Sequence, residues 1–427
     1  MPPEDIRPDH TEADLASGSV LTVDELEQIA LTNNPTVQQA AAVVEKARGI
    51  RRQVGLYPNP TIGYSGEEIG DDGTAGKQGG FISQTIVTGG KLSLNRAVTD
   101  QEISNLIWEL DAQRYRVRNS VRRQFYEALG AQRRVEVARE LLGIVERGVE
   151  TSEGLLKGQE VAKPDVLQAK IQFSEVRILL RNAEYDFEAA WKQLTSLIGQ
   201  PQMPPTALAG SLEDGIPACE FEAVFAQLMS ISPELQAARS RVARARVQIR
   251  RQEVQPIPNV LAQAGVSHDN ASGDDLTSIQ LGIPLPIFNR NQGNIHLAVA
   301  EHRRAVSDLR RLELSLRVRL ADAFRDYSQA QNQVSQYRNQ ILPTARENLD
   351  LTEEGYRAGE FDLIRVLTAR RSVIEANLAY IRSLVSARQA HVEITGLLLT
   401  GGLNDIPDAV GSNLEGIGLR DETLSSQ

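Results

Sequence analysis

The stretch IQLGIPLPIFNRNQGN, residues 279–294, predicts a strand that ends in prolines and leads into a long helix. Apolar residues at every second position, with small or polar residues between them, are typical of a strand with one apolar face. Pro284 and Pro286 lack amide donors, so the strand has to end near them or lie at an unpaired sheet edge. From Asn294 the pattern becomes helical and continues to about residue 357.

The same unit occurs earlier in the chain, which indicates a tandem duplication. Matching features recur at a nearly constant offset, and they are Asn34-Pro35 with Ser232-Pro233, Tyr57-Pro58-Asn59-Pro60 with Pro256-Ile257-Pro258-Asn259, Lys157-Gly158 with Ala358-Gly359, and Val166-Leu167 with Val366-Leu367. An Asp/Gly-rich tip also separates two predicted strands in each half. Each half is therefore expected to fold as two strands followed by a long helical hairpin.

The predicted fold is mainly α with a small β part. Repeat 1 is expected at 21–200, with strands at about 61–69 and 79–88, a long helix over 91–157 and a return helix over 164–198. Repeat 2 is expected at 219–400, with strands at about 258–268 and 276–286, a long helix over 291–357 and a return helix over 362–398. A disordered lead at 1–20, a proline-rich linker at 201–218 and a flexible tail at 401–427 complete the expected organisation.

Both long helices carry apolar seams at steps of three and four, as in coiled coils. The first seam is Leu110, Val117, Val121, Ala128, Ala131, Val135, Ala138, Leu142, Val145 and Val149. The second is Ala298, Ala305, Leu309, Leu312, Leu316, Leu320, Ala323, Tyr327, Ala330, Val334, Tyr337 and Ile341. At about 1.5 Å per residue the first helix would be roughly 100 Å long. Pro343 is expected to kink the second.

Composition excludes several classes of function. The net charge is −10, which argues against nucleic acid as a partner. The single cysteine, Cys219, excludes an internal disulfide framework and a cysteine-rich metal site. The chain contains no run of eighteen apolar residues, so no transmembrane helix is predicted. The polar N-terminus lacks the apolar core of a signal peptide, so we expect either a cytosolic protein or one whose export signal is missing from this chain.

The strands suggest how such a chain could nevertheless enter a membrane. Four strands are too few for a closed barrel, because the smallest membrane barrels have eight. Exposed strand edges promote aggregation, so other copies of the chain are expected to complete the sheet. Ile62, Tyr64, Ile279, Leu281 and Ile283 would suit a lipid-facing wall, and the long helices would continue that wall as a hollow tube.

Several segments resemble the TolC-type outer-membrane factor family over roughly 21–400. They are PNPTIGY, SQTIVTGGK, GIPLPIFNRNQGNI, YRAGEFDLIRVLTARR and the closing glycines Gly199 and Gly396. IPLPIFNRNQG further resembles the branch that serves heavy-metal efflux of the cobalt-zinc-cadmium or copper-silver type. The resemblance implies a homotrimer with a 12-stranded barrel in the outer-membrane lipid and a helical tunnel in the periplasm. It also implies a periplasmic adaptor (membrane fusion protein) and an inner-membrane RND-type transporter as partners.

The expected function is a passive exit duct for heavy-metal cations, without enzymatic activity and without a cofactor. Drug efflux and type I protein secretion are the alternatives within this class, and a soluble coiled-coil adaptor protein is the alternative outside it. The five histidines are scattered and the three methionines form no cluster, so we expect no tight binding of copper, zinc or cobalt. No phosphate-binding loop is present, so nucleotide hydrolysis is not expected.

The resemblance also places a gate and a docking surface at the hairpin tips, over 158–168 and 359–368. Gly158, Gln159, Tyr356, Gly359 and Glu360 are the expected adaptor or transporter contacts. The family pattern implies acidic residues at the positions of Arg365 and Thr368, and this chain departs from it. Asp165 and Arg365 occupy equivalent places in the repeats, so they could pair between neighbouring hairpins, with Asp362 as the other acidic partner. The alternative is that these are ordinary solvated helix charges.

Overall fold

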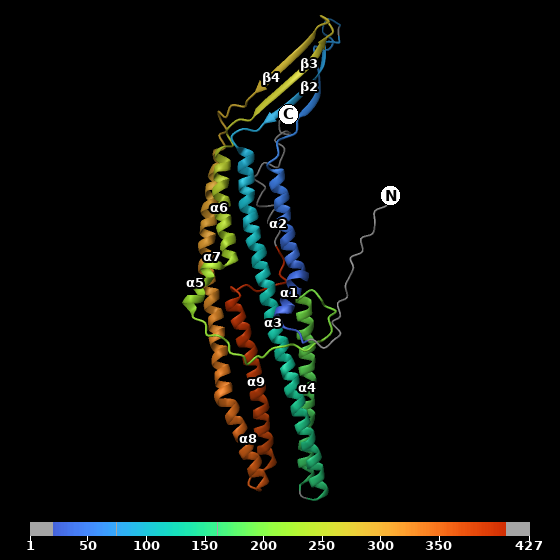
Figure 1. Cartoon of the computed structure of the whole chain (residues 1–427), viewed down its shortest axis with the longest axis vertical. Coiled ribbons are helices and arrows are strands. Elements are labelled where there is room, and N and C mark those ends of the chain that lie inside the picture. The colour runs from blue at the N-terminus through green and yellow to red at the C-terminus, as the bar shows by residue number, and fades with distance from the viewer. Residues whose placement is uncertain (1–19, 74, 160, 407–427) are drawn as a thin grey trace, which may run out of the picture. The chain divides into compact units, whose positions relative to one another are not determined.

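The computed structural model describes residues 20–73, 75–159 and 161–406, which form two compact units. The hairpin unit takes its described residues from 20–35, 115–221 and 320–403, and the sheet unit takes them from 36–114, 222–319 and 404–406. The expected lead at 1–20, apart from Val20, and the expected tail beyond residue 406 lie outside the described residues. Helices dominate both units, and the described strands form one sheet in the sheet unit (Figure 1).

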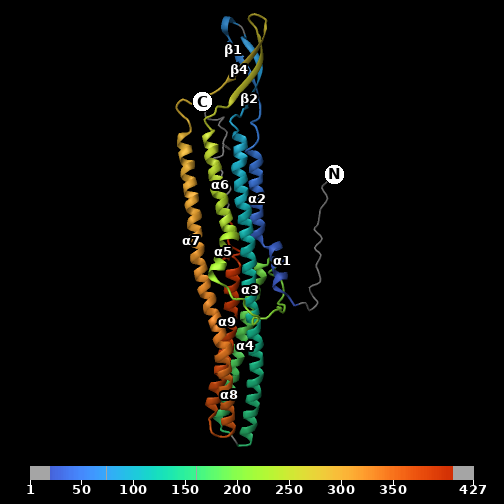
Figure 2. The ribbon, with the colours of Figure 1, turned by 60° about the vertical axis from the view of Figure 1, so that its left-hand side comes forward.

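The sheet consists of four antiparallel strands in the order β1-β2-β3-β4. These strands are β1 (Thr61–Glu67), β2 (Lys77–Ile86), β3 (Val260–Asp269) and β4 (Asp275–Gly282), and a short 3-10 turn, Asp71–Gly73, lies between β1 and β2. The central pairing of β2 with β3 joins the two sequence repeats. β1 and β4 are therefore the two edges of the sheet, and Figure 2 shows both of these strands.

β4 is shorter than the sequence pattern predicts. The strand ends at Gly282, so Ile283 and Leu285 continue the apolar alternation outside the sheet. The physical reason is the pair Pro284 and Pro286, which cannot donate to a strand ladder. The segment 283–288 then leads to α7, which begins at Gln292.

The helices of the sheet unit form a row that begins with α2 and ends with α7 (Figures 1 and 2). These helices are α2 (Pro35–Gln53), the first part of α3 (Lys91–Lys157), α6 (Pro233–Glu253) and the first part of α7 (Gln292–Gln336), with α5 (Phe221–Ile231) preceding α6. Gln113 on α3 donates to Thr36 on α2 at 2.8 Å, and Arg244 on α6 pairs with Glu102 on α3 at 2.8 Å. Arg319 on α7 pairs with Glu234 on α6 at 3.0 Å, which completes the row.

The hairpin unit contains the remainder of α3 and α7 and several further helices. These helices are α4 (Lys163–Leu197), α8 (Leu342–Arg357) and α9 (Leu363–Thr395), together with α1 (Val23–Asn33), and two of them, α4 and α9, return from the tips. Lys170 of α4 pairs with Glu153 of α3 at 2.7 Å, and Arg123 of α3 pairs with Glu393 of α9 at 3.0 Å. Arg370 of α9 pairs with Glu353 of α8 at 2.7 Å. Successive contacts thus join α4 to α3, α3 to α9 and α9 to α8.

The predicted seams form much of the core. The seam positions of α3 that are buried are Leu110, Val117, Val121, Ala128, Ala131, Val135, Ala138 and Val145. On the second long helix Leu316 and Leu320 are completely buried, whereas Ile341 is exposed. None of the helices in the described part of the chain combines the length and the apolar character that a membrane-spanning helix needs.

The second long helix is interrupted just before its proline. A π-helical segment, Tyr337–Ile341, separates α7 from α8, and Pro343 is the second residue of α8. Proline lacks the N–H that would bond the carbonyl four residues earlier, and its ring crowds that carbonyl. The π-helical turn widens the backbone at this point. The same wider turn explains why Ile341, the last predicted seam residue, leaves the seam.

Candidate functional site

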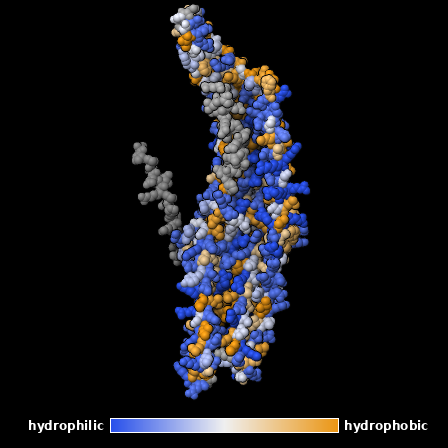
Figure 3. Space-filling model, turned by 180° about the vertical axis from the view of Figure 1, so that it is seen from behind, coloured by the Kyte–Doolittle hydropathy of each residue, from blue (hydrophilic) through white to orange (hydrophobic). Residues whose placement is uncertain are grey.

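The sheet presents one apolar face and one polar face. Adjacent rows across the four strands show this directly, because Ile62, Ile82, Ala264 and Ile279 form one row and Thr61, Ser83, Gln263 and Gln280 form the next. Successive residues of a strand point to opposite faces, so the two rows lie on opposite sides. Ile62 and Ile279 are 81% and 78% exposed. Figure 3 shows apolar side chains on the surface of this region.

Phe81 is an aromatic exception on the polar face. Its ring lies over Gly63 of β1, where an added Cβ would come within 2.4 Å of the ring. On the other side, a Cβ at Gly265 of β3 would lie 3.3 Å from the Cβ of Phe81. Glycine on both neighbouring strands therefore lets this side chain lie close to the sheet.

The two hairpin tips have the same backbone turn at positions exactly 200 residues apart. Gln159 and Gly359 both adopt left-handed conformations, with φ of 61° and 76°. The N–H of Gln159 donates to the carbonyl of Leu156, and the N–H of Gly359 donates to that of Tyr356, each at 3.0 Å. The sequence alignment of Gly158 with Gly359 was therefore wrong by one residue. The left-handed position of the first tip carries glutamine, a residue for which this backbone is unfavourable.

The second tip is covered by an aromatic ring. Phe361 packs on Gly355 of α8, where an added Cβ would lie 2.4 Å from the ring. The N–H of Glu360 donates to the carbonyl of Gly355 at 2.8 Å. The guanidinium carbon of Arg365 lies 4.9 Å from the centroid of Phe361, within the range of a cation–π contact. Sequence reasoning missed this cluster, although its members are ten residues apart or less.

The predicted gate aspartates have local roles at helix N-termini. Asp362 is the N-cap of α9, and its carboxylate accepts from the N–H of Arg365 at 3.1 Å. Asp165 lies in the first turn of α4 and accepts from the N–H of Ala162 at 3.0 Å. Both carboxylates are favoured there by free N–H groups and by the helix dipole. The spacing of Asp362 before the apolar pattern of α9 was a signal that could have predicted its capping role.

The structure does not bring Asp165 and Arg365 together within one chain. Among the described residues, no ion pair joins the two side chains, because Arg365 lies over Phe361 and Asp165 accepts from its own helix terminus. The hydroxyl of Thr368 donates to the carbonyl of Ile364 at 2.8 Å. A pair between neighbouring copies of the chain stays a prediction. The expected contacts Gly158, Gln159, Gly359 and Glu360 are exposed, and Tyr356 is half-buried.

The linker between the repeats is attached along the hairpin unit. The indole N–H of Trp191 donates to the carbonyl of Met203 at 2.9 Å, and the hydroxyl of Tyr327 donates to that of Pro217 at 2.7 Å. Arg388 of α9, which is buried, donates to the carbonyls of Ser211, Leu212 and Asp214. Because these donors come from α4, α7 and α9, the linker connects helices of both repeats. No local residue pattern around Arg388 predicts this role.

The single thiol lies beside a histidine. The Sγ of Cys219 is 3.8 Å from Nδ1 of His391. Burial, with further contributions from Arg388 and Arg122, lowers the pKa of His391. Within the described ranges, no group of three or more His, Cys, Asp or Glu side chains could hold a metal ion. The pair therefore lacks the ligand number of an ordinary zinc site.

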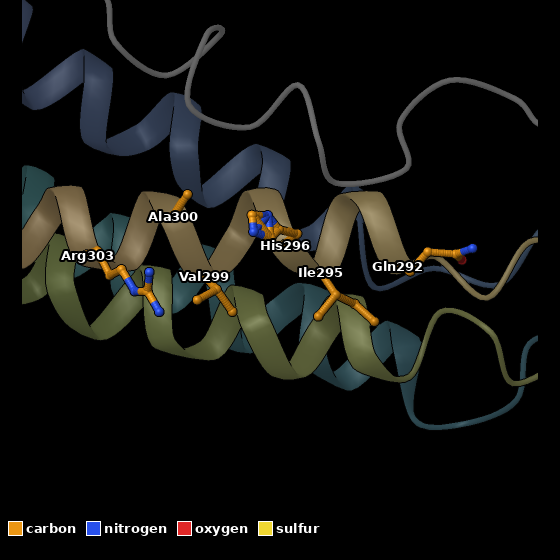
Figure 4. Close-up of a pocket in the computed structure, with 6 residues that line it drawn as sticks. All are labelled: Gln292, Ile295, His296, Val299, Ala300 and Arg303. Carbon is orange, nitrogen blue, oxygen red and sulfur yellow. The ribbon is translucent and has the colours of Figure 1, made fainter.

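The pocket in Figure 4 is a one-sided groove on α7. Its lining residues all belong to this helix, and they are Gln292, Ile295, His296, Val299, Ala300 and Arg303. His302, the nearest other histidine in the sequence, does not line it. The groove lies on the terminal helix of the row in the sheet unit, so we interpret it as an uncovered helix face rather than as a reaction site.

Comparison with known proteins agrees with this architecture. Residues 26–200 and 225–398 match the family model described as outer membrane efflux protein. The cobalt-zinc-cadmium resistance protein CzcC of Cupriavidus metallidurans is 25% identical over 381 residues, covering 88% of this chain and 90% of that protein. The pyoverdine export outer membrane protein OpmQ of Pseudomonas putida is 24% identical over 288 residues, covering 63% and 60%.

Solved structures show the same fold. A crystal structure of CusC has a TM-score of 0.74 at 19% identity, covering 89% of this chain and 92% of that one. The outer membrane protein VceC of Vibrio cholerae has a TM-score of 0.71 at 19% identity, covering 89% and 96%. The similarity thus extends over both the strands and the long helices of the chain.

Proposed function

Because the chain belongs to the outer membrane efflux protein family and is an efflux channel of the outer membrane, we propose that three copies form the passive exit duct of a tripartite pump. A periplasmic adaptor and an inner-membrane RND-type transporter would supply the substrate and the energy. The duct itself would catalyse no reaction. The observation that carries this proposal is the open sheet with one apolar and one polar face.

The sheet supports assembly from several copies. β1 and β4 each leave one row of backbone donors and acceptors without a strand partner within the described sheet. Four strands cannot close a barrel, whereas three copies would supply twelve. The apolar row that includes Ile62 and Ile279 would then face lipid, and the polar row that includes Ser83 and Gln280 would face the water-filled interior. The long helices would form the wall of the periplasmic tunnel.

The assembly is tested by measuring the mass of the purified protein in mild detergent. We expect a trimer of the 46.9 kDa chain and no folded monomer. Ile279→Lys and Gln280→Lys are a matched pair, because the residues are adjacent and lie on opposite faces. Lysine on the lipid face costs about 2–4 kcal/mol near the bilayer midplane, so the first variant should lose membrane insertion and the second should keep it. A monodisperse monomer without detergent would overturn the proposal.

Heavy-metal cations are the proposed substrate class. The support is the similarity to CzcC, whose name records cobalt-zinc-cadmium resistance. Since the transporter selects the substrate, the duct needs no tight metal site. OpmQ is named for pyoverdine export, so a small organic substrate is the second candidate. Drug efflux or protein secretion would use the same duct architecture. Deletion of the gene followed by growth on cobalt, zinc, cadmium, copper, drugs and iron-limited medium separates these substrates.

We further propose that the hairpin tips hold the closed gate and the docking surface. Asp165 and Arg365 occupy the same position in the two repeats and lie in the first turns of α4 and α9. An exposed ion pair contributes only about 0–1 kcal/mol, and threefold symmetry would repeat it around the constriction. A gate this weak could be opened by partner binding, whose differential contacts supply the energy. Gly158, Gln159, Tyr356, Gly359 and Glu360 would meet the adaptor or transporter.

A further inference from the structure

Helix α4 is apolar on two opposite sides. One side is buried in the hairpin unit through Val166, Val176, Ala183, Ala190 and Leu194. The other carries Leu167, Ile171, Ile178 and Tyr185, each between 51% and 61% exposed. Their spacing of four, seven and seven residues places them on one line along the helix. We call this line the α4 outer seam.

An exposed seam of this kind is typical of a helix that packs against two partners. A surface helix normally has one apolar face and a polar face opposite it. Four large apolar side chains on that opposite face form a heptad seam like that of a coiled coil. Figure 3 shows such apolar patches interrupting the hydrophilic surface of the helical part.

A row of basic residues follows the seam. Lys163, Lys170 and Arg177 are seven residues apart, so they lie on one line beside the seam. Lys170 is engaged by Glu153 of the same chain at 2.7 Å. Arg177 is exposed, and no ion pair involves it among the described residues. In a coiled coil this flanking position faces the side chains of the partner helix, so Arg177 indicates an acidic partner.

The matching surface lies on α8. Its buried residues are Leu342, Thr352 and Gly355. Leu351, four residues before the buried Gly355, is 58% exposed at the margin of that side, and Glu347, Asp350 and Glu354 are exposed on the side away from it. Within the described part of the chain none of these three carboxylates takes part in an ion pair. Leu351 with these carboxylates is called the α8 acidic row.

We propose that the α4 outer seam of one copy packs against the α8 acidic row of a second copy, with Arg177 pairing with Glu347 or Asp350. This inference rests on the proposed assembly from copies and names the surfaces that meet. The charges are complementary. α4 and α8 are also the two ends of the series of contacts from α4 through α3 and α9 to α8, so each has a side for a further helix.

The positions of these residues along the helices agree with the pairing. α4 begins at Lys163 directly after the first tip, and α8 ends at Arg357 directly before the second. The two helices therefore run antiparallel when their tips are level. Lys170 and Asp350 are then both seven residues from the tip-proximal helix end. Arg177 is 14 residues from the tip-proximal end of α4, and Glu347 is 10 residues from that of α8. The difference of four residues is about 6 Å along the axis, which a long arginine side chain can span.

Cysteine cross-linking tests the contact directly. Cys219→Ser removes the single native thiol, and Ile171→Cys with Leu351→Cys then places one thiol on each surface. Oxidation of the full-length protein in membranes should produce covalent dimers and trimers on a denaturing gel. The matched control replaces Ile171→Cys by Gln168→Cys, an exposed residue of α4 about 60° from Ile171 and further from the seam line. The control should cross-link at least fivefold less.

The result separates this inference from the proposed function. A trimer by mass without covalent oligomers, or with cross-links equal to the control, would overturn the inference and leave the duct intact. A monomer by mass would overturn both this inference and the proposed trimeric duct. Cross-links within one chain, or to a different protein instead of a second copy, would also overturn it. A monofunctional maleimide label that reacts with both thiols in denaturant confirms that each is present.

Charge reversal provides a second measurement. Arg177→Glu should lower the trimer fraction at limiting detergent-solubilised concentration, and Glu347→Arg with Asp350→Arg should restore it in the same chain. An equal trimer fraction in all these variants would contradict the proposed ion pair. Arg325→Glu is the control, because Arg325 of α7 belongs to neither surface and pairs with Asp322 of its own helix at 3.0 Å.

Discussion

The side-chain amide of Asn119 donates to the carbonyl oxygens of Gly396 and Leu399, each at 2.7 Å. Between these carbonyls Leu397 and Leu398 both have left-handed backbones, with φ of 60° and 59°. Such conformations are unfavourable for leucine, so surrounding contacts have to hold them. Gly396 itself has a φ of −84°, which any residue can adopt, so glycine is needed there for space and not for its backbone conformation. A Cβ there would lie 2.3 Å from the amide of Asn119.

Asn119→Ala should therefore destabilise the hairpin unit. It removes two hydrogen bonds from buried carbonyls, and an unsatisfied buried group costs about 1–3 kcal/mol. We expect a lower midpoint in denaturant, measured by circular dichroism, with the trimer retained at low denaturant. Asn339→Ala is the control, because Asn339 is exposed and its side chain donates to the hydroxyl of Ser335, one turn earlier, at 3.2 Å. Equal midpoints for the two variants would contradict this role of Asn119.

The equivalent positions of the two tips predict opposite effects of glycine. Gln159→Gly should stabilise the first tip, because the left-handed backbone suits glycine. Gly359→Ala should destabilise the second tip for the same reason. Gly359→Ala should cost about 1–2 kcal/mol, the penalty of a left-handed backbone for a residue with a Cβ. Gln159→Gly should gain less than this, because glycine loses more conformational freedom on folding. Hydrogen exchange of the last turns of α3 and α8 measures both, and slower exchange in Gly359→Ala would contradict the assignment.

The attachment of the linker to the helices is expected to depend on Arg388. Arg388→Ala leaves the carbonyls of Ser211, Leu212 and Asp214 without their buried donor. We expect limited proteolysis to cut the linker at least several times faster, with the helices still protected. Arg382→Ala, on the same helix, is a control for loss of an α9 arginine. Equal cleavage rates in the two variants would show that the linker is held by other contacts.

Much of the fold follows from the local pattern of residues. The expected helix at 91–157 has the same bounds as α3, because a proline-free seam of Ala and Val leaves no alternative to a long helix. The apolar and polar strand rows follow from alternation, but the ends of β1 and β2 were each placed two residues too late and the end of β4 four residues too late. Membership of the outer membrane efflux protein family agrees with the resemblance seen in the sequence.

Features that depend on tertiary contacts were not predictable in this way. The alignment of the tips failed at Gln159, since a glutamine gives no signal for a left-handed backbone. Phe361 and Gly355 are close in sequence, but their contact depends on how the tip folds back on α8. In the sequence Arg388 is one of many polar residues on a helix. Its role depends on the path of the linker, whose carbonyls accept its hydrogen bonds.

The proposed gate pair gives the last prediction. In a single chain Arg365 lies over Phe361, and Asp165 accepts from Ala162, so a pair between hairpins has to compete with these local contacts. A cation–π contact at an exposed site contributes about 0.5–1 kcal/mol, similar to an exposed ion pair. Phe361→Leu should therefore release Arg365 for pairing and lower the conductance of the closed channel in planar bilayers.

Asp165→Ala and Arg365→Ala should each raise that conductance, and the double variant Asp165→Arg with Arg365→Asp should return it toward the closed value. Asp165→Asn is the matched control for the capping role, because asparagine also accepts at a helix N-terminus but carries no charge. If the ion pair holds the gate, Asp165→Asn should conduct like Asp165→Ala. If Asp165→Asn instead conducts like the unchanged protein, capping explains the residue and the gate pair is wrong.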